Sequence, residues 1–429
     1  MILRIESEVF QGGHAPFPHI FGEPQGIPGR GKRRRGGARP AKPGALIQGK
    51  IGSPPPSVPE GGRAKKWFLM DAARAALVSH GVKANITACG LPRGRGGEGR
   101  VAFRAEKDGQ GKRAVAVDGV LWCGSARCPR CAPLVGKQLQ ERVQEVMDAS
   151  WAKDWHVVLV TMTAGHDRHT RLIDARKDMG DAWTGLQRGA PWNRAMERGM
   201  AGVVRVWEPT WGWITGWHLH PHCLLIHKGT AEEALAEGEW LIDRWMAAMR
   251  KRGWPVDRQG QDVRLVTRPA SGEAGDALSR YEMKSMTGWG AAAEMASGWV
   301  KEGRRPDRLS VPQLLGLAAA GDEVAAEKYA EAVSALKGQR VFMLGPRLAA
   351  ELGIEASEVE DEEEIEVEAQ DGEVLGELPG SVWVAAAKRR LRGWALAEIE
   401  RLTAFGICWE DVESVVTDRV QSRRQPAPA

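Results

Sequence analysis

The sequence predicts an α+β fold: a central antiparallel sheet with flanking helices, a small element built on four cysteines, and helical C-terminal segments. Short β-branched runs alternate with helical patterns through the middle of the chain, and hairpin-like turns separate neighbouring strands, as is typical of this class. The run 216–226 (GWHLHPHCLLI) has a period of two, so it predicts a strand with two chemically different faces. A chain of 429 residues exceeds one ordinary domain, and we expect one large core with appended segments.

The individual elements follow from the same patterns. We expect helices over 67–79, 137–149 and 232–251, strands over 155–163, 203–208, 216–226 and 262–266, and a further helix that carries Tyr281. The Gly-rich, charged stretch that ends near Gly111 predicts a loop or a hairpin.

Composition divides the chain into seven segments. These are 1–63, a basic Gly/Pro-rich tail expected to be disordered; 64–136, a helix and the four-cysteine element; 137–300, the central domain; 301–354, a helical segment packed on the core; 355–380, an acidic linker; 381–420, a C-terminal helical pair; and 421–429, a disordered tail. The basic tail is either a solvated extension or an arm that contacts DNA. The C-terminal pair is either a separate small module or an appendage for dimerisation or DNA binding.

Composition also excludes some classes of protein. No apolar stretch approaches the roughly 20 residues that a membrane span requires, and the N-terminus lacks the pattern of a secretory signal, so we expect a cytoplasmic protein without membrane partners. The six cysteines fit a reducing compartment better than a disulfide framework. A formal net charge of +5 combines a basic N-terminal cluster with an acidic run between Glu355 and Glu377, and it favours a polyanionic partner.

Three cysteines crowd together in the pattern C-x4-C-P-x-C. Cys123, Cys128 and Cys131 form this cluster, and Cys89 is the obvious fourth member. Four thiolates around Zn²⁺ make a closed, structural site without an open coordination position. The alternative is a set of separate buried thiols.

The strand 216–226 places three histidines on one face. His218, His220 and His222 are about 6.6 to 7 Å apart in successive pairs, close enough for two neighbours to share an ion. Glu208 ends the preceding strand and can supply a carboxylate oxygen if the two strands pair. Such a mixed set suits Mg²⁺ or Mn²⁺. The alternatives are histidines on a solvated sheet face and a surface carboxylate.

Tyrosine is scarce in this chain: Tyr281 and Tyr329 are the two present. Helical spacing puts Tyr281 and Lys284 on one face, where the ammonium favours a phenolate. A phenolate can attack a phosphodiester and retain the bond energy in a phosphotyrosine. The alternative for a single helical tyrosine is packing.

At this point the residues resemble the rolling-circle replication initiators of small bacterial plasmids, within the HUH endonuclease superfamily. The matching features lie between about 89 and 345 and occur in the family's order. They are the cysteine cluster, the strand VVLVTMT, the run RVWEPT at 205–210, GWHLHPHCLLI, the Arg280-Tyr281-x-x-Lys284 motif, and the segment 311–340. Departures are Gln339, where the family commonly has a basic residue, and Ala277, where it has an acidic one.

The resemblance identifies 137–300 as the nicking and joining catalytic domain, and it implies roles for single residues. His220 and His222 look like the paired ligands of a catalytic Mg²⁺ or Mn²⁺, with Glu208 as a further ligand and His218 as a less certain third histidine. Tyr281 looks like the nucleophile, assisted by Lys284. The implied reaction nicks one strand at a double-strand origin through a 5′-phosphotyrosine, leaves a 3′-hydroxyl primer, and rejoins strands at termination. Glu273 or Asp276 is expected to replace the acidic residue of the family that serves in termination.

The expected partners are single-stranded and double-stranded origin DNA, and the resemblance adds host helicase and replication machinery; the oligomeric state stays open. Basic residues proposed to contact DNA are Arg127, Arg130, Lys137, Arg205, Arg264 and Arg280. Two other readings remain. One is an HUH relaxase or transposase, and the other is a noncatalytic, zinc-containing DNA-binding regulator in which the histidines are structural.

Overall fold

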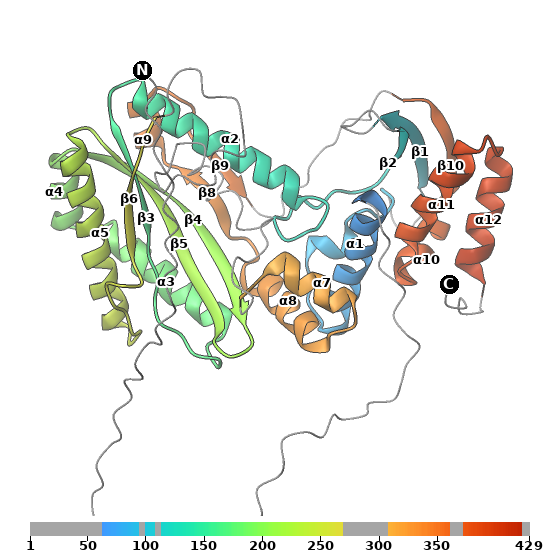
Figure 1. The fold of residues 1–429 in the computed structure, drawn as a ribbon, viewed down its shortest axis with the longest axis horizontal. Coiled ribbons are helices and arrows are strands. Elements are labelled where there is room, and N and C mark those ends of the chain that lie inside the picture. Colours follow the sequence, from blue (N-terminus) through green and yellow to red (C-terminus); the bar gives the residue numbers. More distant parts are fainter. Residues whose placement is uncertain (1–61, 94–98, 108–112, 269–307, 361–371, 423–429) are drawn as a thin grey trace, which may run out of the picture. The chain divides into compact units, whose positions relative to one another are not determined.

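The computed structural model describes residues 62–93, 99–107, 113–268, 308–360 and 372–422 (Figure 1). Within these ranges the protein is a mixed α+β fold with three antiparallel sheets. The largest sheet has five strands, in the spatial order β6 (Asp262–Val266), β3 (His156–Thr161), β5 (Gly216–His227), β4 (Met200–Gly212) and β7 (Leu309–Ser310). The antiparallel sheet with helices around it is therefore confirmed, and β7 lies beyond residue 300, the expected end of the catalytic domain.

Strands β4 and β5 form a long hairpin that is the centre of the sheet. They pair from Met200↔His227 to Gly212↔Gly216, so β4 is about twice as long as the predicted strand 203–208. The turn needs a glycine on its return side. Gly216 has a φ of +77°, and a Cβ there would lie 2.6 Å from the carbonyl oxygen of Asp167.

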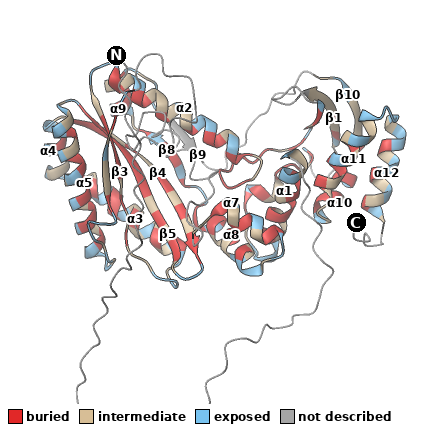
Figure 2. Cartoon of the chain, viewed as in Figure 1, coloured by how far each residue is buried: buried red, intermediate tan, exposed pale blue. Residues whose placement is uncertain are grey.

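Two helices pack on one face of this sheet: α5 (Ala231–Lys251) and α3 (Leu172–Leu186). A Cβ added to Gly238 of α5 would lie 2.8 Å from Val263 Cγ1 and 3.5 Å from Val160 Cγ2, so α5 lies directly on the strands. Cys223, the register partner of Val160, is fully buried on the same face. Figure 2 shows the buried residues along both central strands. This is the packed side that the alternating strand predicts.

The opposite face carries the histidines. At one end of it, Leu348 of α9 (Pro346–Leu352) covers Gly202 of β4, with Leu348 Cδ2 3.0 Å from the position of an added Cβ. Helix α2 (Ala132–Trp151) contacts β3, and β8 (Arg340–Leu344) contacts β4 and pairs with β9 (Ser357–Glu360). Towards the β4–β5 turn, Glu208 and His220 keep part of their surface open to solvent.

A second sheet joins distant parts of the chain. Its order is β10 (Val374–Pro379), β1 (Arg100–Lys107) and β2 (Arg113–Asp118), so the stretch near Gly111 links a hairpin. The sequence predicts an acidic linker over 355–380, but the structure has β9 near the start of this segment and β10 near its end. The acidic residues of this segment outnumber its apolar ones, so composition did not predict that Leu378 is buried in the core.

The C-terminal region contains three helices rather than a pair: α10 (Gly380–Lys388), α11 (Arg392–Ala404) and α12 (Trp409–Gln421). The first break falls at Arg390, which has a φ of 58°, without the glycine that marks many helix ends. Helix α11 packs on α1 (Gly62–Ser79), and a Cβ added to Gly393 would lie 2.5 Å from the carbonyl oxygen of Ala64. The C-terminal helices therefore contact the cysteine-containing part of the chain.

The segment 301–354 is helical where the structure describes it. Helices α7 (Val311–Ala319) and α8 (Glu323–Ala335) pack on α1, and α8 also contacts α3. Tyr329 on α8 is fully buried, and its hydroxyl donates to the carbonyl oxygen of Arg127 at 3.0 Å. Helices α3 and α4 (Ala190–Glu197) have no counterpart among the sequence-based predictions. Among the described helices, none has both the length and the apolar character that spanning a bilayer requires.

Candidate metal centres

The sheet register brings Glu208, His220 and His222 to one place. Glu208 on β4 is the direct partner of His220 on β5, and Thr161 on β3 is the partner of His222, so all four side chains share one face. Glu208 Oε2 lies 2.9 Å from His222 Nε2 and 3.3 Å from His220 Nε2. One ligand atom from each of Glu208, His220 and His222 lies within 4.8 Å of the other two, so this group can hold a metal ion.

The charges in this group suit metal binding. Burial opposes the ionisation of Glu208, but hydrogen bonds from His220 and His222 outweigh it and hold the pKa of the carboxyl below its usual value. Burial lowers the pKa of His220 as well. An ionised carboxylate beside a neutral imidazole is the protonation state that a divalent ion needs in its ligands.

Thr161 supports the site from the neighbouring strand. Its Oγ1 lies 3.1 Å from Nδ1 of His222, while Nε2 of the same ring faces Glu208. A hydrogen bond at the far nitrogen fixes the orientation of a ligating imidazole. His220 differs, because its Nδ1 is buried without a hydrogen-bond partner in the described structure. Sequence reasoning missed Thr161, although it ends the strand VVLVT and pairs with His222.

His218 stands beside the three-residue group rather than in it. Its ring centre lies 4.9 Å from that of His220 and 4.8 Å from that of His166, so four imidazoles form a row. Burial lowers the pKa of His218 to about 2, with smaller contributions from His220 and Arg308. His166 was not predicted. Its Nδ1 donates to the carbonyl oxygen of Thr215 at 2.8 Å, and only the fold shows this residue to be near.

Arg308 is another residue that sequence reasoning missed. It immediately precedes β7, whose Ser310 pairs with Thr210, the partner of His218. Its positive charge contributes to the lowered pKa of His166, His218 and His220, after burial. Its Nε is buried without a hydrogen-bond partner among the described residues. A cation in this position can attract an anionic group to the histidine row.

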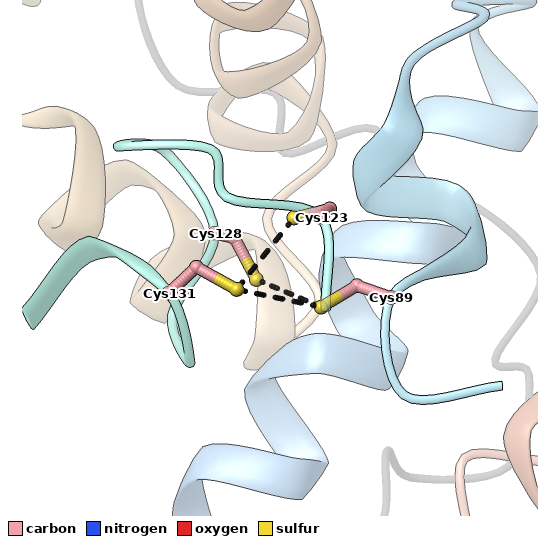
Figure 3. A group of neighbouring side chains, drawn as sticks. All are labelled: Cys89, Cys123, Cys128 and Cys131. Atoms are coloured by element: carbon pink, nitrogen blue, oxygen red, sulfur yellow. Dashed lines mark hydrogen bonds between the residues drawn. The ribbon is translucent and has the colours of Figure 1, made fainter. Parts of the chain in front are cut away.

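The four predicted cysteines form a second cluster (Figure 3). The sulfur of Cys89 lies 3.7 Å from that of Cys131 and 3.5 Å from that of Cys128, and the sulfurs of Cys123 and Cys131 are 3.8 Å apart. All four side chains are buried. Hydrogen bonds from the neighbouring thiols, that of Cys123 first, lower the pKa of Cys131. The cluster can hold a metal as thiolates.

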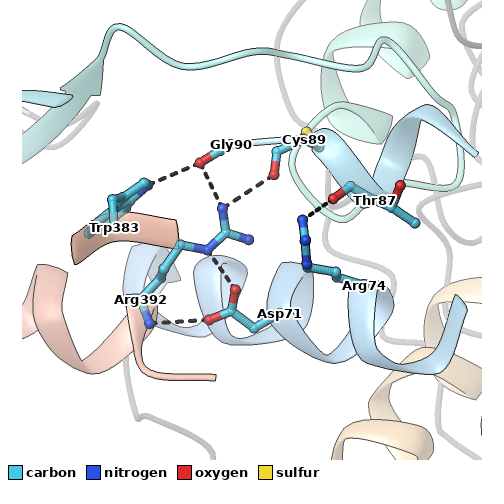
Figure 4. Close-up of polar contacts among 7 residues, drawn as sticks. All are labelled: Asp71, Arg74, Thr87, Cys89, Gly90, Trp383 and Arg392. Atoms are coloured by element: carbon cyan, nitrogen blue, oxygen red, sulfur yellow. Dashed lines mark hydrogen bonds and ion pairs between the residues drawn. The ribbon is translucent and has the colours of Figure 1, made fainter. Parts of the chain in front are cut away.

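A buried ion pair supports the loop that carries Cys89 (Figure 4). Arg392 of α11 donates from Nε to Asp71 Oδ1 at 2.6 Å, and from Nη1 to the carbonyl oxygens of Cys89 at 3.2 Å and Gly90 at 2.7 Å. The two charged side chains are 1% and 0% exposed. Trp383 of α10 donates its indole N–H to the same Gly90 carbonyl. The C-terminal helices thus fix the backbone next to the first cysteine.

The basic residues proposed to contact DNA have different surroundings. Arg127 is buried and donates from Nη2 to the carbonyl oxygen of Leu336 at 2.6 Å. Arg205 is partly buried, with its guanidinium 5.1 Å from the ring centre of Trp183 and 4.6 Å from that of Trp207. Burial lowers the pKa of Arg205 to about 10. The strand register accounts for the position of Arg205, because odd-numbered β4 residues face the helices.

The remaining basic residues are accessible or lie outside the described ranges. Lys137 and Arg264 are exposed and pair with Glu141 and Asp262, respectively. Arg130 is partly exposed, with its guanidinium 4.8 Å from the ring centre of Trp122. The residues outside the described ranges are Arg280, Tyr281 and Lys284, with Glu273, Asp276 and Ala277 beside them.

Comparison with known proteins finds two relatives, each of which matches over only part of its length. The chain is 29% identical over 234 residues to "Protein rep" of Streptomyces lividans, covering 43% of this chain and 50% of the relative. It is 33% identical over 147 residues to "Neomycin resistance protein" of Streptomyces cyanogenus, covering 28% of this chain and 33% of that protein. The chain thus spans half or less of the length of these relatives. No family model matches, and no solved structure matches.

Proposed function

We propose that this protein initiates plasmid replication by nicking and rejoining one DNA strand, as a metal-dependent enzyme of the HUH type. The observation that carries the proposal is the convergence of Glu208, His220 and His222 on one sheet face whose reverse is packed with helices. The likeness to the Rep protein of Streptomyces lividans supports a replication role. The neomycin-resistance name carries no argument, because the match covers a third of that protein.

The donor sets indicate which metal each centre takes. A carboxylate with two imidazoles suits Mg²⁺ or Mn²⁺, and four thiolates suit Zn²⁺. With Zn–S bonds of about 2.3 Å, the edge of a tetrahedral site is about 3.8 Å. The sulfur–sulfur distances of 3.5, 3.7 and 3.8 Å fit that edge. When bound, the divalent ion at the histidines would supply Lewis-acid polarisation of the scissile phosphate.

Tyr281 is the nucleophile in this proposal. The chain has two tyrosines, and Tyr329 is unsuited because it is fully buried, its hydroxyl is engaged by Arg127, and burial raises its pKa well above the usual value. The Tyr281 phenolate would form a bond to phosphorus while the bond from phosphorus to the 3′ oxygen breaks. The leaving oxygen takes a proton and becomes the 3′-hydroxyl primer, and Lys284 would stabilise the phenolate.

The proposed cycle of nicking and rejoining also implies binding partners. Single-stranded and double-stranded origin DNA are the substrates, with host helicase and replication machinery acting after the nick. At termination a 3′-hydroxyl attacks the phosphotyrosine, which rejoins the strand and releases the phenol. Arg308 would draw the anionic strand towards the histidine row. The proposed catalytic domain over 137–300 would then extend to β7, the edge strand that pairs with β4.

The test uses labelled single-stranded DNA from the origin of the replicon that encodes the protein, with Mn²⁺. Wild-type protein should form an adduct that survives denaturation, and Tyr281→Phe should lose the adduct while it keeps DNA binding. Tyr329→Phe is the matched control. It removes a hydroxyl that bonds to Arg127, which costs about 1 kcal/mol of stability, and it should keep the adduct.

The outcomes separate the competing functions. An adduct retained in Tyr281→Phe and lost in Tyr329→Phe would contradict the assignment of the nucleophile. Specific binding of origin DNA without any cleavage, in Mn²⁺ and also in Mg²⁺, would instead support a noncatalytic zinc-containing regulator. Cleavage of a transfer origin or a transposon end, in preference to a replication origin, would support a relaxase or transposase.

A further inference from the structure

A cavity of ≈ 190 Å³ lies beside the cysteine cluster, apart from the histidine face. Helix α1 contributes Arg63 and Lys66 to its lining, and the cysteine-containing loop contributes Trp122 and Arg130. The cavity has room for a group much larger than one water molecule, whose share of liquid volume is about 30 Å³. The proposed nicking reaction does not use this cavity.

The charges around the cavity do not balance. It is also lined by Glu106 and Asp118, but both carboxylates are engaged: Glu106 pairs with Arg63, and Asp118 with Arg104 at 2.5 Å. Lys66 and Arg130 have no carboxylate partner among the residues that the structure describes. Two cations that share a cavity without a counter-ion leave a positive potential that an anion can neutralise.

The electrostatics of Lys66 agree with this account. Burial lowers the pKa of its ammonium, and the charges of Arg130 and Arg63 lower it further. The ammonium is therefore repelled by both guanidinium groups, which line the same cavity. A bound anion would relieve that repulsion.

The cysteine cluster helps to position Arg130, one of the two cations. Trp122 and Arg130 each directly precede a cysteine of the cluster, and the Arg130 guanidinium lies 4.8 Å from the centre of the Trp122 ring. Trp122 in turn packs on Trp67 of α1, with ring centres 5.8 Å apart. A stacked guanidinium has a restrained plane, which favours planar, two-pronged recognition of an oxyanion.

We propose that this cavity binds a backbone phosphate of DNA, at a contact separate from the site of cleavage. Lys66 supplies a point charge and Arg130 supplies donors in a fixed fork, while the tryptophan walls border the adjoining sugar. The choice of DNA as the source of the phosphate rests on the proposed function. The charge imbalance and the cavity themselves predict an anion site in any case.

The experiment measures DNA binding by fluorescence anisotropy of the full chain, without added Mg²⁺ or Mn²⁺ so that no cleavage occurs. Labelled single-stranded and duplex oligonucleotides are titrated over a series of salt concentrations. Removing one phosphate contact should flatten the slope of log K against log salt by about 0.9 for duplex and about 0.7 for single strands. Lys66→Ala with Arg130→Ala should show this change and a roughly tenfold weaker Kd at low salt.

The matched control removes the same charge elsewhere. Lys177 on α3 and Arg252, the residue that follows α5, are a second pair of neighbouring exposed cations, and the double variant Lys177→Ala with Arg252→Ala should keep the wild-type slope. Arg130→Lys, which keeps the charge, should retain most of the slope and lose part of the affinity. Zinc content and circular dichroism show whether each variant folds. If the Lys66→Ala, Arg130→Ala double variant does not fold, Lys66→Glu alone replaces it in the experiment.

The outcomes are decisive in both directions. An unchanged salt slope in a folded Lys66→Ala, Arg130→Ala protein overturns the proposal. If inorganic phosphate or a mononucleotide binds the wild type at Lys66 and Arg130 while the DNA slope is unaffected by their removal, the site takes a free anion and DNA is excluded. Tyr281→Phe should bind DNA as the wild type does, so failure of the nicking proposal leaves this measurement unaffected.

Discussion

The cysteine cluster and the histidine group are both candidate metal centres, and they differ in how completely the protein encloses them. The four thiols are buried, three measured sulfur–sulfur distances fall between 3.5 and 3.8 Å, and Arg392 and Trp383 hold the backbone beside Cys89. The histidine group is partly open, with Glu208 16% and His220 13% exposed. It also leaves Nδ1 of His220 without a hydrogen bond in the described structure.

This difference predicts a structural centre at the cysteines and a reactive centre at the histidines. A closed set of four ligands contributes to folding and leaves no position for a substrate. An open set of three ligands leaves positions for a phosphate oxygen and water. Stability should therefore depend on the cysteines and activity on the histidines, and five changes test that division, in descending order of expected effect.

The largest effect should follow the loss of a thiolate. Cys128→Ser should release the metal and unfold the surrounding element, because structural zinc in small fingers contributes about 10–16 kcal/mol of binding free energy. Metal analysis and urea unfolding measure this. Cys408→Ser, at an exposed cysteine outside the cluster, should keep both metal and stability. A Cys128→Ser protein with one full equivalent of zinc would contradict the four-thiolate site.

The next effect should come from the buried ion pair that supports the same element. Asp71→Asn leaves Arg392 buried without its counter-charge, which should lower the free energy of unfolding by about 3–5 kcal/mol. Glu377→Gln is the control, because its ion pair with Arg100 is exposed and should contribute less than about 1 kcal/mol. Equal losses from the two substitutions would show that burial of the Asp71 pair adds nothing.

Removing the histidine pair should change activity far more than stability. His220→Ala with His222→Ala should abolish metal-dependent cleavage and the rise in Tm that Mn²⁺ produces, while the metal-free free energy of unfolding changes by about 1–2 kcal/mol. His169→Ala, at an exposed histidine, should behave as wild type. Full cleavage by the double variant, or by wild-type protein freed of divalent ions, would reject the metal-assisted mechanism.

A smaller effect should follow the loss of the hydroxyl beside His222. Thr161→Val keeps the shape of the side chain and removes its hydrogen bond to Nδ1, so Mn²⁺ affinity should fall by about 10- to 100-fold. Calorimetric titration of the metal gives the affinity. Thr184→Val, which removes an exposed hydroxyl on α3, is the comparison and should leave the affinity unchanged. Wild-type affinity in Thr161→Val would mean that the ring needs no such support.

The smallest effect should be that of mild acidification. Protons compete with metal at an imidazole below its pKa, and burial places the pKa of His220 below the ordinary value of 6.5. The carboxyl of Glu208 also has a lowered pKa and stays ionised. Mn²⁺ affinity should therefore stay constant as the pH falls from 8 to 6.5. A tenfold loss over that interval would show an imidazole with a raised pKa, because a group with the ordinary pKa is only about half protonated at pH 6.5.

The elements that were predicted correctly are those whose pattern is local. The period of two in GWHLHPHCLLI gave β5 and its two faces, and the β-branched run before Thr163 gave β3. Strand β6 has the predicted bounds. The paired position of Glu208 and His220 follows from a hairpin whose turn is visible in the sequence as Trp and Gly residues.

The features that were missed depend on contacts between distant residues. His166 and Arg308 reach the histidine row only through the fold, and neither belongs to a recognisable motif. The contact of Arg205 with the ring of Trp183 also depends on the fold, because it joins a strand to a helix. Strand β10 was hidden by its acidic context, since composition alone does not reveal that β1 offers it a pairing edge.

The link from Arg392 to Cys89 spans 303 residues of sequence. All four cysteines emerge from the ribosome early in translation, so their sulfurs can meet while most of the protein is still being made. Asp71, however, must wait for its buried counter-charge until α11 has been synthesised. Until then, the backbone at Cys89 and Gly90 lacks the hydrogen bonds from Arg392, so a product that ends before residue 392 should be more open to proteolysis at this loop.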